Sequence, residues 1–202
     1  MVSNEEISVN KRNGRGKESL QIDKIHAMVG FATEGITGVS ASHVEMNSGI
    51  QLFDGISTAD IQQILIKSAN DLITLENPNY QYVAARLLLF SLRKQLFHRL
   101  WDHPKLIDHI KKLIDMGLYD KDILVNYDES EIDRMNMWID HERDYNFTYA
   151  GLRQVMDKYL VQDRSTGEIF ETPQFMYMMI SATLFAQYPK DKRMSYVKKY
   201  YD

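Results

Sequence analysis

Apolar residues recur at the spacing of an α-helix along most of this sequence. The pattern is clearest at Ile25, Met28, Val29 and Ala32, which are three, one and three residues apart and therefore share one helix face. The alternation typical of a half-buried strand is limited to short segments. The sequence therefore predicts a mainly α-helical fold with a small β component.

The start of the chain is predicted to be a β-hairpin followed by a helix. Residues 7–9 and 20–22 alternate between apolar and polar, and Asn13-Gly14 between them favours a turn. Asp23 is then expected to cap the helix at its N-terminus. Gly35 stands where a left-handed residue favours the end of that helix.

Three further helices are predicted before residue 97. The first follows Ser40 and is closed by a loop at residues 53–55. Thr58 is the expected N-cap of a longer helix, and Asn77-Pro78 is the expected start of the next. A hairpin and four helices thus fill the first part of the chain.

The periodicity breaks at residues 101–104, where Pro104 favours a helix boundary. We place a domain border there, which divides the chain into residues 1–97 and 98–202. Helical patterns return in three segments of the second part, at residues 106–116, 129–138 and 149–158.

The last forty residues hold one short β pattern and two helices. Residues 159–161 and 169–171 flank a polar turn, which predicts a β-hairpin or a tight ordered loop. From Pro173 to Ala186 a helix follows that is apolar nearly all round, so we expect it to be buried, and its contiguous apolar surface favours a partner. A final helix is predicted over residues 191–201.

Composition excludes several classes of function. The chain has 24 Lys and Arg against 28 Asp and Glu, a formal net charge of -4, and lacks the basic excess that attracts nucleic acid. The densest apolar run, residues 175–186, is far short of the roughly 20 residues that span a bilayer, and no apolar signal core opens the chain. We therefore expect a cytoplasmic protein without membrane or nucleic-acid partners.

The absence of cysteine excludes disulfides and thiol chemistry carried by this chain. Of the six histidines, His98, His103 and His109 are spaced across a proline, so no single helix face gathers them as metal ligands. We interpret the histidines as surface or packing residues and expect no metal in this chain. The eleven methionines are interpreted as core residues.

A basic set gathers around the predicted hairpin, at Lys11, Arg12, Lys17 and Lys24. Lys24 falls in the first turn of a helix, where a cation opposes the helix dipole unless an anion lies nearby. Two interpretations stay open at this point, an anion or nucleotide site and a solvated basic face. Arg93 and Lys94 would complement the negative end of the fourth helix.

Five segments of the sequence resemble the large subunit of aerobic (class I) ribonucleotide reductase, in its phage and enterobacterial branch. These segments are KRNGRGKESLQIDKIH, FDGISTADIQ, YQYVAARLLLF, HERDYNFTY and YLVQDRSTGEIFETPQF, at residues 11–26, 53–62, 80–90, 141–149 and 159–175. The resemblance implies that residues 1–97 form an ATP cone, a four-helix bundle capped by a small sheet. Residues 98–202 would then be the N-terminal helical region of that subunit, without its catalytic barrel.

The resemblance also implies a nucleotide site for ATP as allosteric effector, with dATP as a second effector in many members. Lys11, Arg12, Thr58 and Lys94 would contact the phosphates. The segment that wraps base and ribose would comprise Glu18, Ser19, Leu20, Gln21, Ile22, Asp23 and Lys24.

Ile25, Leu52 and Phe90 stand where the family lines its adenine slot, or else belong to the core. Gln62 replaces a histidine of many members, which weakens the case for dATP inhibition, and Arg15 resembles an insertion.

In that family the reaction needs a thiyl radical and a reducing pair of cysteines, which this chain lacks. The resemblance therefore implies three partners: the catalytic C-terminal portion of the large subunit, a radical-generating small subunit, and further copies of the assembled large subunit. The chain would be a split or truncated subunit that serves deoxyribonucleotide synthesis, in the host cytoplasm if a phage encodes it. A freestanding ATP-binding module and a remnant that binds nothing are the alternatives.

Overall fold

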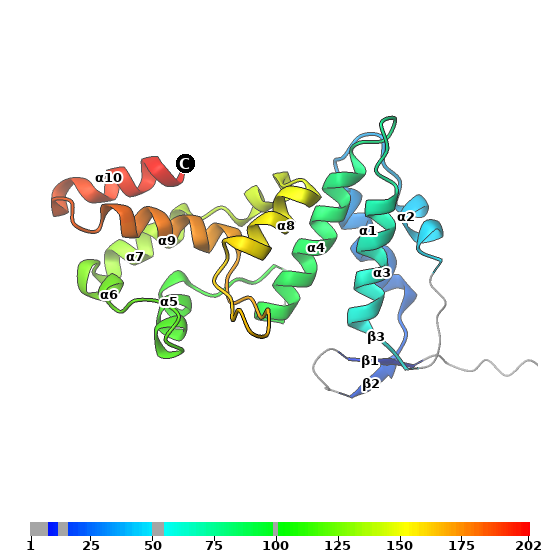
Figure 1. The fold of residues 1–202 in the computed structure, drawn as a ribbon, viewed down its shortest axis with the longest axis horizontal. Helices are drawn as coiled ribbons and strands as arrows, with labels where there is room; N and C mark the ends of the chain where they lie inside the picture. Colours follow the sequence, from blue (N-terminus) through cyan, green and yellow to red (C-terminus); the bar gives the residue numbers. More distant parts are fainter. Residues whose placement is uncertain (1–7, 12–15, 50–54, 99–100) are drawn as a thin grey trace, which may run out of the picture. The chain divides into compact units, whose positions relative to one another are not determined.

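The computed structural model describes residues 8–11, 16–49, 55–98 and 101–202 (Figure 1). The chain forms two compact units. The first comprises residues 1–91 together with 145–152, and the second comprises 92–144 and 153–202. The described elements are mostly helices with one small sheet near the N-terminus, which confirms the predicted fold class. The domain border near residue 97 stays a prediction.

The sheet of the first unit has three short strands in the order β2-β1-β3. Strand β1, Ser8–Asn10, runs antiparallel to β2, Lys17–Ser19. Strand β3, Ile56–Ser57, runs parallel to β1. The hairpin is confirmed, but its second strand lies at 17–19 rather than 20–22, because residues 20–22 lead into the first helix. Strand β3 has two residues, too few to produce an alternating pattern.

Four helices build the rest of the first unit. They are α1 (Ile22–Thr33), α2 (Ala41–Ser48), α3 (Thr58–Asp71) and α4 (Tyr80–Phe97), whose last residues are grouped with the second unit. Helix α2 packs against both α1 and α3. Their fully buried side chains include Val29, Val44, Leu65, Val83 and Leu87, which follow the helical spacing seen in the sequence.

Two predicted helix caps are wrong. Asp23 lies within the first turn of α1, because the helix begins at Ile22 and Gln21 is its N-cap residue, without a side-chain cap. Thr58 is the first residue of α3, and the cap is Ser57, whose Oγ accepts a hydrogen bond of 3.0 Å from the amide of Asp60.

Other signals at helix ends are confirmed. Ser40 caps α2, and Gly35 has φ +71°, the left-handed conformation that glycine adopts without steric cost. Helix α4 begins at Tyr80, two residues after Pro78.

Because Ser57 supplies the only side-chain oxygen recorded on an N-terminal amide of α3 in the part of the chain that the structure describes, its loss should weaken this helix. We expect Ser57→Ala to lower the free energy of unfolding of the first unit by about 1 kcal/mol. Ser57→Thr keeps the acceptor and should cost a few tenths of that. Urea denaturation followed by circular dichroism measures both, and equal losses in the two variants would contradict the assignment of the cap.

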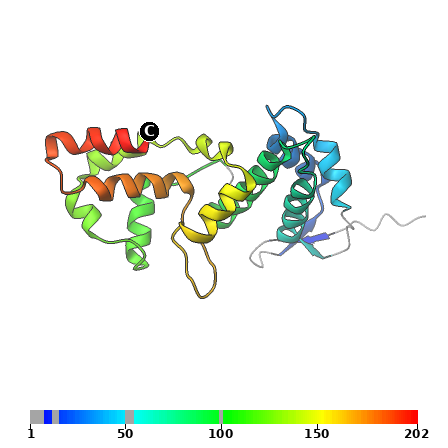
Figure 2. The same ribbon diagram turned by 45° about the horizontal axis from the view of Figure 1, so that its top comes forward.

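The second unit is all-helical. It holds α5 (Leu106–Asp115), α6 (Asp122–Asn126), α7 (Glu129–Trp138), most of the 3-10 helix His141–Asn146, most of α8 (Tyr149–Lys158), α9 (Pro173–Phe185) and α10 (Lys190–Tyr201). Helix α10 lies along α9, and α7 contacts both α5 and α10 (Figures 1 and 2). Their shared core includes Leu106, Ile110, Ile132, Met178 and Val197. Met176 and Met178 are buried, as predicted for core methionines.

Three details of this unit differ from prediction or sharpen it. Residues 159–171 form a tight ordered loop with a single bridge, Gln162 to Ile169, rather than a full hairpin. Helix α6 was not predicted, because five residues are too few to show a helical period. Helix α9 is not wholly internal, since Ile180 and Leu184 are 42% and 53% exposed. Among the described helices, none is both long enough and apolar enough to span a membrane.

Candidate functional site

Charged side chains meet where the hairpin passes into α1. Lys11 directly follows β1, Glu18 lies on β2, and Lys11 Nζ is 3.0 Å from Glu18 Oε2. The hydrogen bond from Lys11 lowers the pKa of Glu18, and the charge of Lys24 lowers it further. Three of the predicted site residues, two from the hairpin and one from α1, therefore share one electrostatic environment.

The segment between β2 and α1 is largely solvent-exposed. Ser19, Gln21, Ile22, Asp23 and Lys24 are exposed, and Glu18 and Leu20 are half-buried. Lys24 lies in the first turn of α1, as predicted, where the helix dipole disfavours a cation and favours an anion. This exposed edge, which carries Lys11, Lys17 and Lys24, can therefore bind a polyanion such as a nucleoside triphosphate.

The remaining predicted site residues are placed as follows. Thr58 is half-buried at the start of α3, beside the end of β3. Lys94 is in the last turn of α4, among residues grouped with the second unit, so its part in the site stays a prediction. Arg12 and Leu52 lie outside the described residues.

Two residues considered for the nucleotide site serve the core of the first unit. Phe90 is 1% exposed and packs edge-to-face against Tyr145, with ring centroids 6.2 Å apart. Gln62 is 2% exposed, and its Nε2 donates a hydrogen bond of 2.9 Å to the backbone oxygen of Leu87. The side chain of Gln62 thus ties α3 to α4, which gives this glutamine a packing role of its own.

A buried polar network in the second unit was not foreseen from the sequence. Arg93, 1% exposed, donates to Asp144 Oδ2 at 3.4 Å and to the backbone oxygen of His141 at 2.6 Å. Gln174 Nε2 donates to Asp144 Oδ1 at 2.8 Å, and Tyr201 Oη donates to Gln174 Oε1 at 2.7 Å. Burial raises the pKa of Asp144 to about 6.

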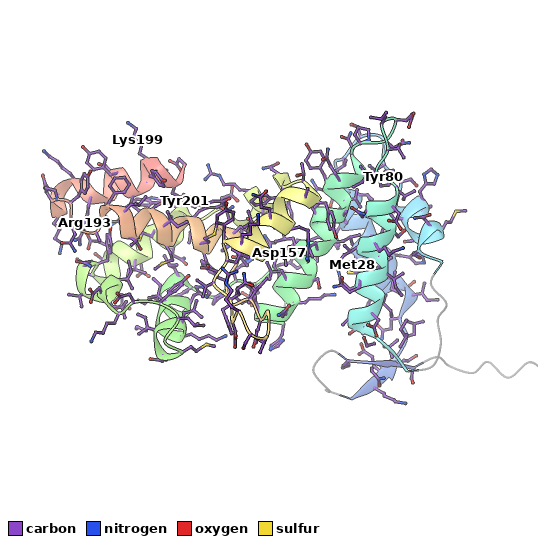
Figure 3. The ribbon with its side chains drawn as sticks, in the orientation of Figure 1. Met28, Tyr80, Asp157, Arg193, Lys199 and Tyr201 are labelled. Atoms are coloured by element: carbon purple, nitrogen blue, oxygen red, sulfur yellow. The ribbon has the colours of Figure 1, made fainter. Side chains whose placement is uncertain are left out.

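This network corrects the prediction for Arg93. The guanidinium does not remain at the surface to complement the end of α4, because it is buried against a carboxylate 51 positions further along the chain. A basic residue on an otherwise apolar helix face indicates a buried ion pair, but the sequence did not identify Asp144 as the partner. The hydrogen bonds among Arg93, Asp144, Gln174 and Tyr201 link α4, the 3-10 helix, α9 and α10. Figure 3 labels Tyr201, which contributes to this network from α10.

Three histidines pack into an aromatic cluster of the second unit, as predicted for packing residues. The rings of His103 and His141 stack at 3.7 Å, and His109 stacks on Phe175 at 4.3 Å. Burial lowers the pKa of His103 and His109 to about 4 and that of His141 to about 3. Within the described ranges, no group of three potential ligands is placed to hold a metal ion.

Comparison with known families defines the class of each part. Residues 7–95 match the family described as ATP cone domain. Residues 145–202 match the family described as ribonucleotide reductase, all-alpha domain. The exposed basic edge of the hairpin and α1 therefore lies within the part that matches the ATP cone, and residues 153–202 of the second unit lie within the part that matches the all-alpha domain.

Similar proteins are alpha subunits of ribonucleoside-diphosphate reductase. The chain is 48% identical to the Haemophilus influenzae subunit and 47% identical to subunit alpha of reductase 1 of Escherichia coli, each over 199 residues and 98% of this chain. It is 41% identical to the subunit of Enterobacteria phage T4 over 196 residues. The chain spans 26% of the length of these relatives. The chain is therefore similar to the N-terminal quarter of reductase large subunits, which confirms the resemblance.

Proposed function

We propose that this chain is the regulatory N-terminal part of a ribonucleoside-diphosphate reductase large subunit and binds ATP as an allosteric effector. The observation that supports this most is the cluster of Lys11, Glu18 and Lys24 on the exposed edge of the ATP cone. Reduction of ribonucleotides in this family requires cysteines, and this chain has none. The cysteines would come from the catalytic portion that occupies the rest of the large subunit.

In the proposed site, Lys11, Arg12, Thr58 and Lys94 contact the phosphates, and residues 18–24 surround base and ribose. Hydrogen bonds from lysine or arginine to phosphate are charge-assisted and contribute about 1.5–3 kcal/mol each. The Lys11–Glu18 ion pair is open to solvent, which screens it, so it holds Lys11 only weakly. Phosphate can therefore draw Lys11 away from Glu18, which frees the carboxylate to accept a hydrogen bond from the base or the sugar.

The site also accommodates dATP in this proposal. dATP differs from ATP at one ribose hydroxyl, and phosphate and base contacts are the same for both. The side chain of Gln62 donates a hydrogen bond to the backbone of α4. We therefore assign Gln62 no role in inhibition by dATP. We expect dATP to displace labelled ATP from the chain with an affinity within about tenfold of that of ATP.

The assembled enzyme would use this site to bias its quaternary structure. An effector shifts an equilibrium only as far as its affinities for the two states differ. ATP on the cone would favour the active arrangement of the large subunits with a radical-generating small subunit. The large subunit itself would be a homo-oligomer.

The Lys24→Ala variant tests the site. Loss of a phosphate-facing cation should raise the Kd for ATP about fivefold or more, which is about 1 kcal/mol. The melting temperature without ATP should stay within about 1 °C, because Lys24 is exposed. Isothermal titration calorimetry and thermal denaturation provide the two measurements.

Lys67→Ala is the matched control, since Lys67 is an exposed lysine of the same unit whose recorded partner is Asp71. Its Kd for ATP should equal that of the unmodified chain. An unchanged Kd in Lys24→Ala would show that the site residues are wrong. Absence of saturable ATP binding by the unmodified chain would overturn the proposed function.

A further inference from the structure

A side-chain hydrogen bond joins the first strand to the residue that precedes the third. Asn10 is the last residue of β1, and its Nδ2 donates a hydrogen bond of 2.6 Å to the backbone oxygen of Gly55, 45 positions further along the chain. The amide of Gly55 in turn donates to the backbone oxygen of Ser8 at 2.9 Å. Both backbone polar groups of Gly55 are therefore bound to β1, one by its main chain and one by the side chain of Asn10.

The conformation of Gly55 suits this position. Its φ is +86°, in the left-handed region that residues other than glycine rarely adopt. A Cβ atom at Gly55 would lie 3.7 Å from Asn10 Nδ2, which is ordinary van der Waals contact. The backbone conformation, rather than a lack of space, therefore requires glycine here, and the carbonyl oxygen of this residue is the acceptor for Asn10.

The main-chain pairing between β1 and β3 is short. Strand β3 has two residues, Ile56 and Ser57, which pair with Val9 and Asn10. A parallel ladder of two residue pairs provides few main-chain hydrogen bonds. The side-chain bond of Asn10 is therefore a substantial part of what holds β3 against β1.

This bond joins two segments of the proposed nucleotide site. Lys11 directly follows Asn10, and Thr58 directly follows Ser57, the residue of β3 that pairs with Asn10. Thr58 begins α3, whose N-terminal end favours an anion, and Figure 1 shows the sheet at this end of the helix. Lys11 and Thr58, which we propose to contact the phosphates, thus belong to segments that meet at Asn10.

Lys11 is held from the other side by the hairpin. Its amide donates to the backbone oxygen of Gly16 at 2.9 Å, and its exposed Nζ pairs with Glu18. The main chain of Lys11 is thus fixed, so the position of Lys11 relative to Thr58 depends on how β1 is joined to β3. Residues that bind one ligand together must be held within about 0.5 Å of the productive geometry.

We propose that Asn10 is a positioning residue of the nucleotide site, whose bond to Gly55 fixes the distance between Lys11 and Thr58 so that both contact the same phosphate chain. This proposal rests on the proposed function. It assigns to Asn10 a role that acts through Lys11, because the amide nitrogen of Asn10 is engaged with Gly55.

The Asn10→Ala variant removes the bond. Its Kd for ATP should rise about fivefold or more, because a displaced phosphate contact loses a charge-assisted hydrogen bond. Isothermal titration calorimetry at a temperature at which every variant is folded measures this Kd. The loss of one hydrogen bond should also lower the melting temperature without ATP by about 2–6 °C.

Asn47→Ala is the matched control for this loss of stability. Asn47 Nδ2 donates a hydrogen bond of 3.2 Å to the backbone oxygen of Ser68, in the same unit, and so joins α2 to α3. The variant loses the same kind of bond, but its Kd for ATP should stay within about twofold of that of the unmodified chain. A rise in Kd equal to that of Asn10→Ala would show that both losses reflect stability alone, against the proposal.

A double-mutant cycle with Lys11→Ala separates positioning from a general weakening of the unit. In a chain that already carries Lys11→Ala, Asn10→Ala should raise the Kd for ATP by less than about twofold, because the contact that Asn10 positions is absent. The same factor with and without Lys11 would show that Asn10 does not act through Lys11, and would overturn the proposal. So would a Kd that Asn10→Ala leaves unchanged.

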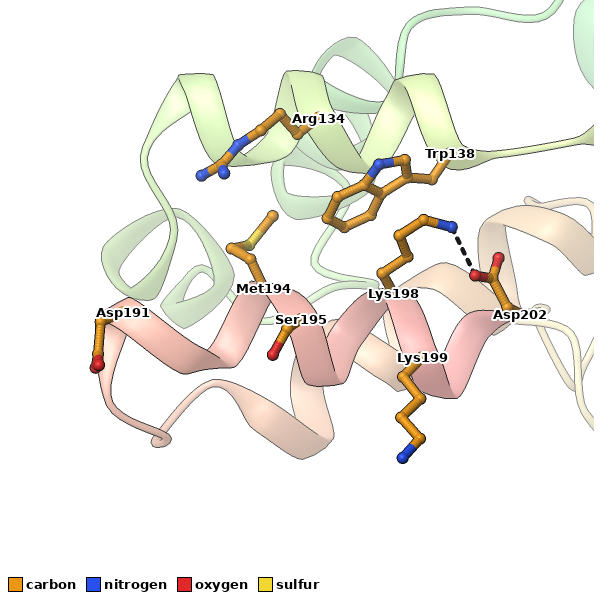
Figure 4. A pocket seen from close by; sticks show the side chains of 8 residues that line it. All are labelled: Arg134, Trp138, Asp191, Met194, Ser195, Lys198, Lys199 and Asp202. Carbon is orange, nitrogen blue, oxygen red and sulfur yellow. Dashed lines mark hydrogen bonds and ion pairs between the residues drawn. The ribbon is translucent and has the colours of Figure 1, made fainter.

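A hollow in the second unit provides a control for unspecific attraction of ATP by lysine. This open hollow of about 550 Å³ lies between α7 and α10, with Trp138 on one side and Lys198 on the other (Figure 4). Lys198 pairs with Asp202 at 2.6 Å, whereas Lys199 is exposed. Lys199→Ala should leave the Kd for ATP unchanged. A larger effect of Lys199→Ala than of Asn10→Ala would place ATP in the hollow and overturn the proposal.

The proposed function and the positioning role fail in different ways. Absence of saturable ATP binding by the unmodified chain would contradict the proposed function, and the positioning role with it. ATP binding that Lys24→Ala weakens and Asn10→Ala leaves unchanged would contradict only the positioning role.

Discussion

Replacement of Arg93 by alanine should lower the free energy of unfolding of the second unit by about 3–5 kcal/mol. The variant removes the cation that faces Asp144, whose side chain is fully buried, and leaves the backbone oxygen of His141 without its donor. Burial already raises the pKa of Asp144 to about 6. Without Arg93 this pKa should rise further, so part of the loss should disappear at pH 5, where Asp144 takes up a proton.

The measurement is urea denaturation followed by tryptophan fluorescence, because both tryptophans, Trp101 and Trp138, lie in the second unit. Arg153→Ala is the matched control. Its ion pair with Asp157 is about half exposed on both sides, so its loss should cost at most about 1 kcal/mol. Similar losses in the two variants would show that the buried network contributes no more than a surface pair.

The second unit should also lose stability as the pH falls from 7 to 5. Its three packed histidines have pKa values of about 4, 4 and 3 in the folded chain, below the ordinary 6.5. Between these values and 6.5 the unfolded chain binds more protons than the folded chain, so stability is full above about pH 6.5 and falls below it.

Asp144 acts in the opposite direction. Its pKa is raised from 3.8 to about 6, so its protonation stabilises the folded chain as the pH falls through 6. Each unit of pKa shift corresponds to about 1.4 kcal/mol. The shifted pKa of one carboxyl group therefore offsets only part of the effect of three shifted imidazole pKa values. We expect a net loss of about 3 kcal/mol or more between pH 7 and pH 5.

Urea denaturation at several pH values measures this loss. His109→Phe replaces a ring that stacks on Phe175 by one that does not titrate, so the variant should show a weaker pH dependence. His98→Asn, at an exposed position with φ +59°, should keep the full dependence, because asparagine tolerates that conformation. A stability that does not change between pH 7 and pH 5 would contradict the packing of neutral imidazoles.

Local signals in the sequence predicted many elements to the residue. Helices Glu129–Trp138 and Tyr149–Lys158 have the predicted bounds. The first of these helices begins with a capping box, in which the side chains of Asp128 and Glu131 each accept a hydrogen bond from the other residue's backbone amide. Such signals involve residues three or four positions apart, so they are complete within the sequence itself.

Elements too short for a period were missed, and so were pairings across long separations. Strand β3 exists because two residues meet β1, 47 positions away, and residues 145–152 return to the first unit. The residues of the candidate site were predicted from the family resemblance and from the basic set around the hairpin. The structure adds that Lys11, Glu18 and Lys24 are neighbours, while their contact with a nucleotide stays a prediction.

The sequence by itself determined the helical class, most helix bounds and the family, since periodicity, caps and motif strings are properties of neighbouring residues. Only the tertiary structure decided which polar groups are buried and which apolar groups are not. Arg93 is buried and Tyr200 is exposed, against what each side chain favours in isolation. The physical reason is that burial depends on contacts between residues far apart in the chain, such as Arg93 with Asp144, and no local pattern encodes such contacts.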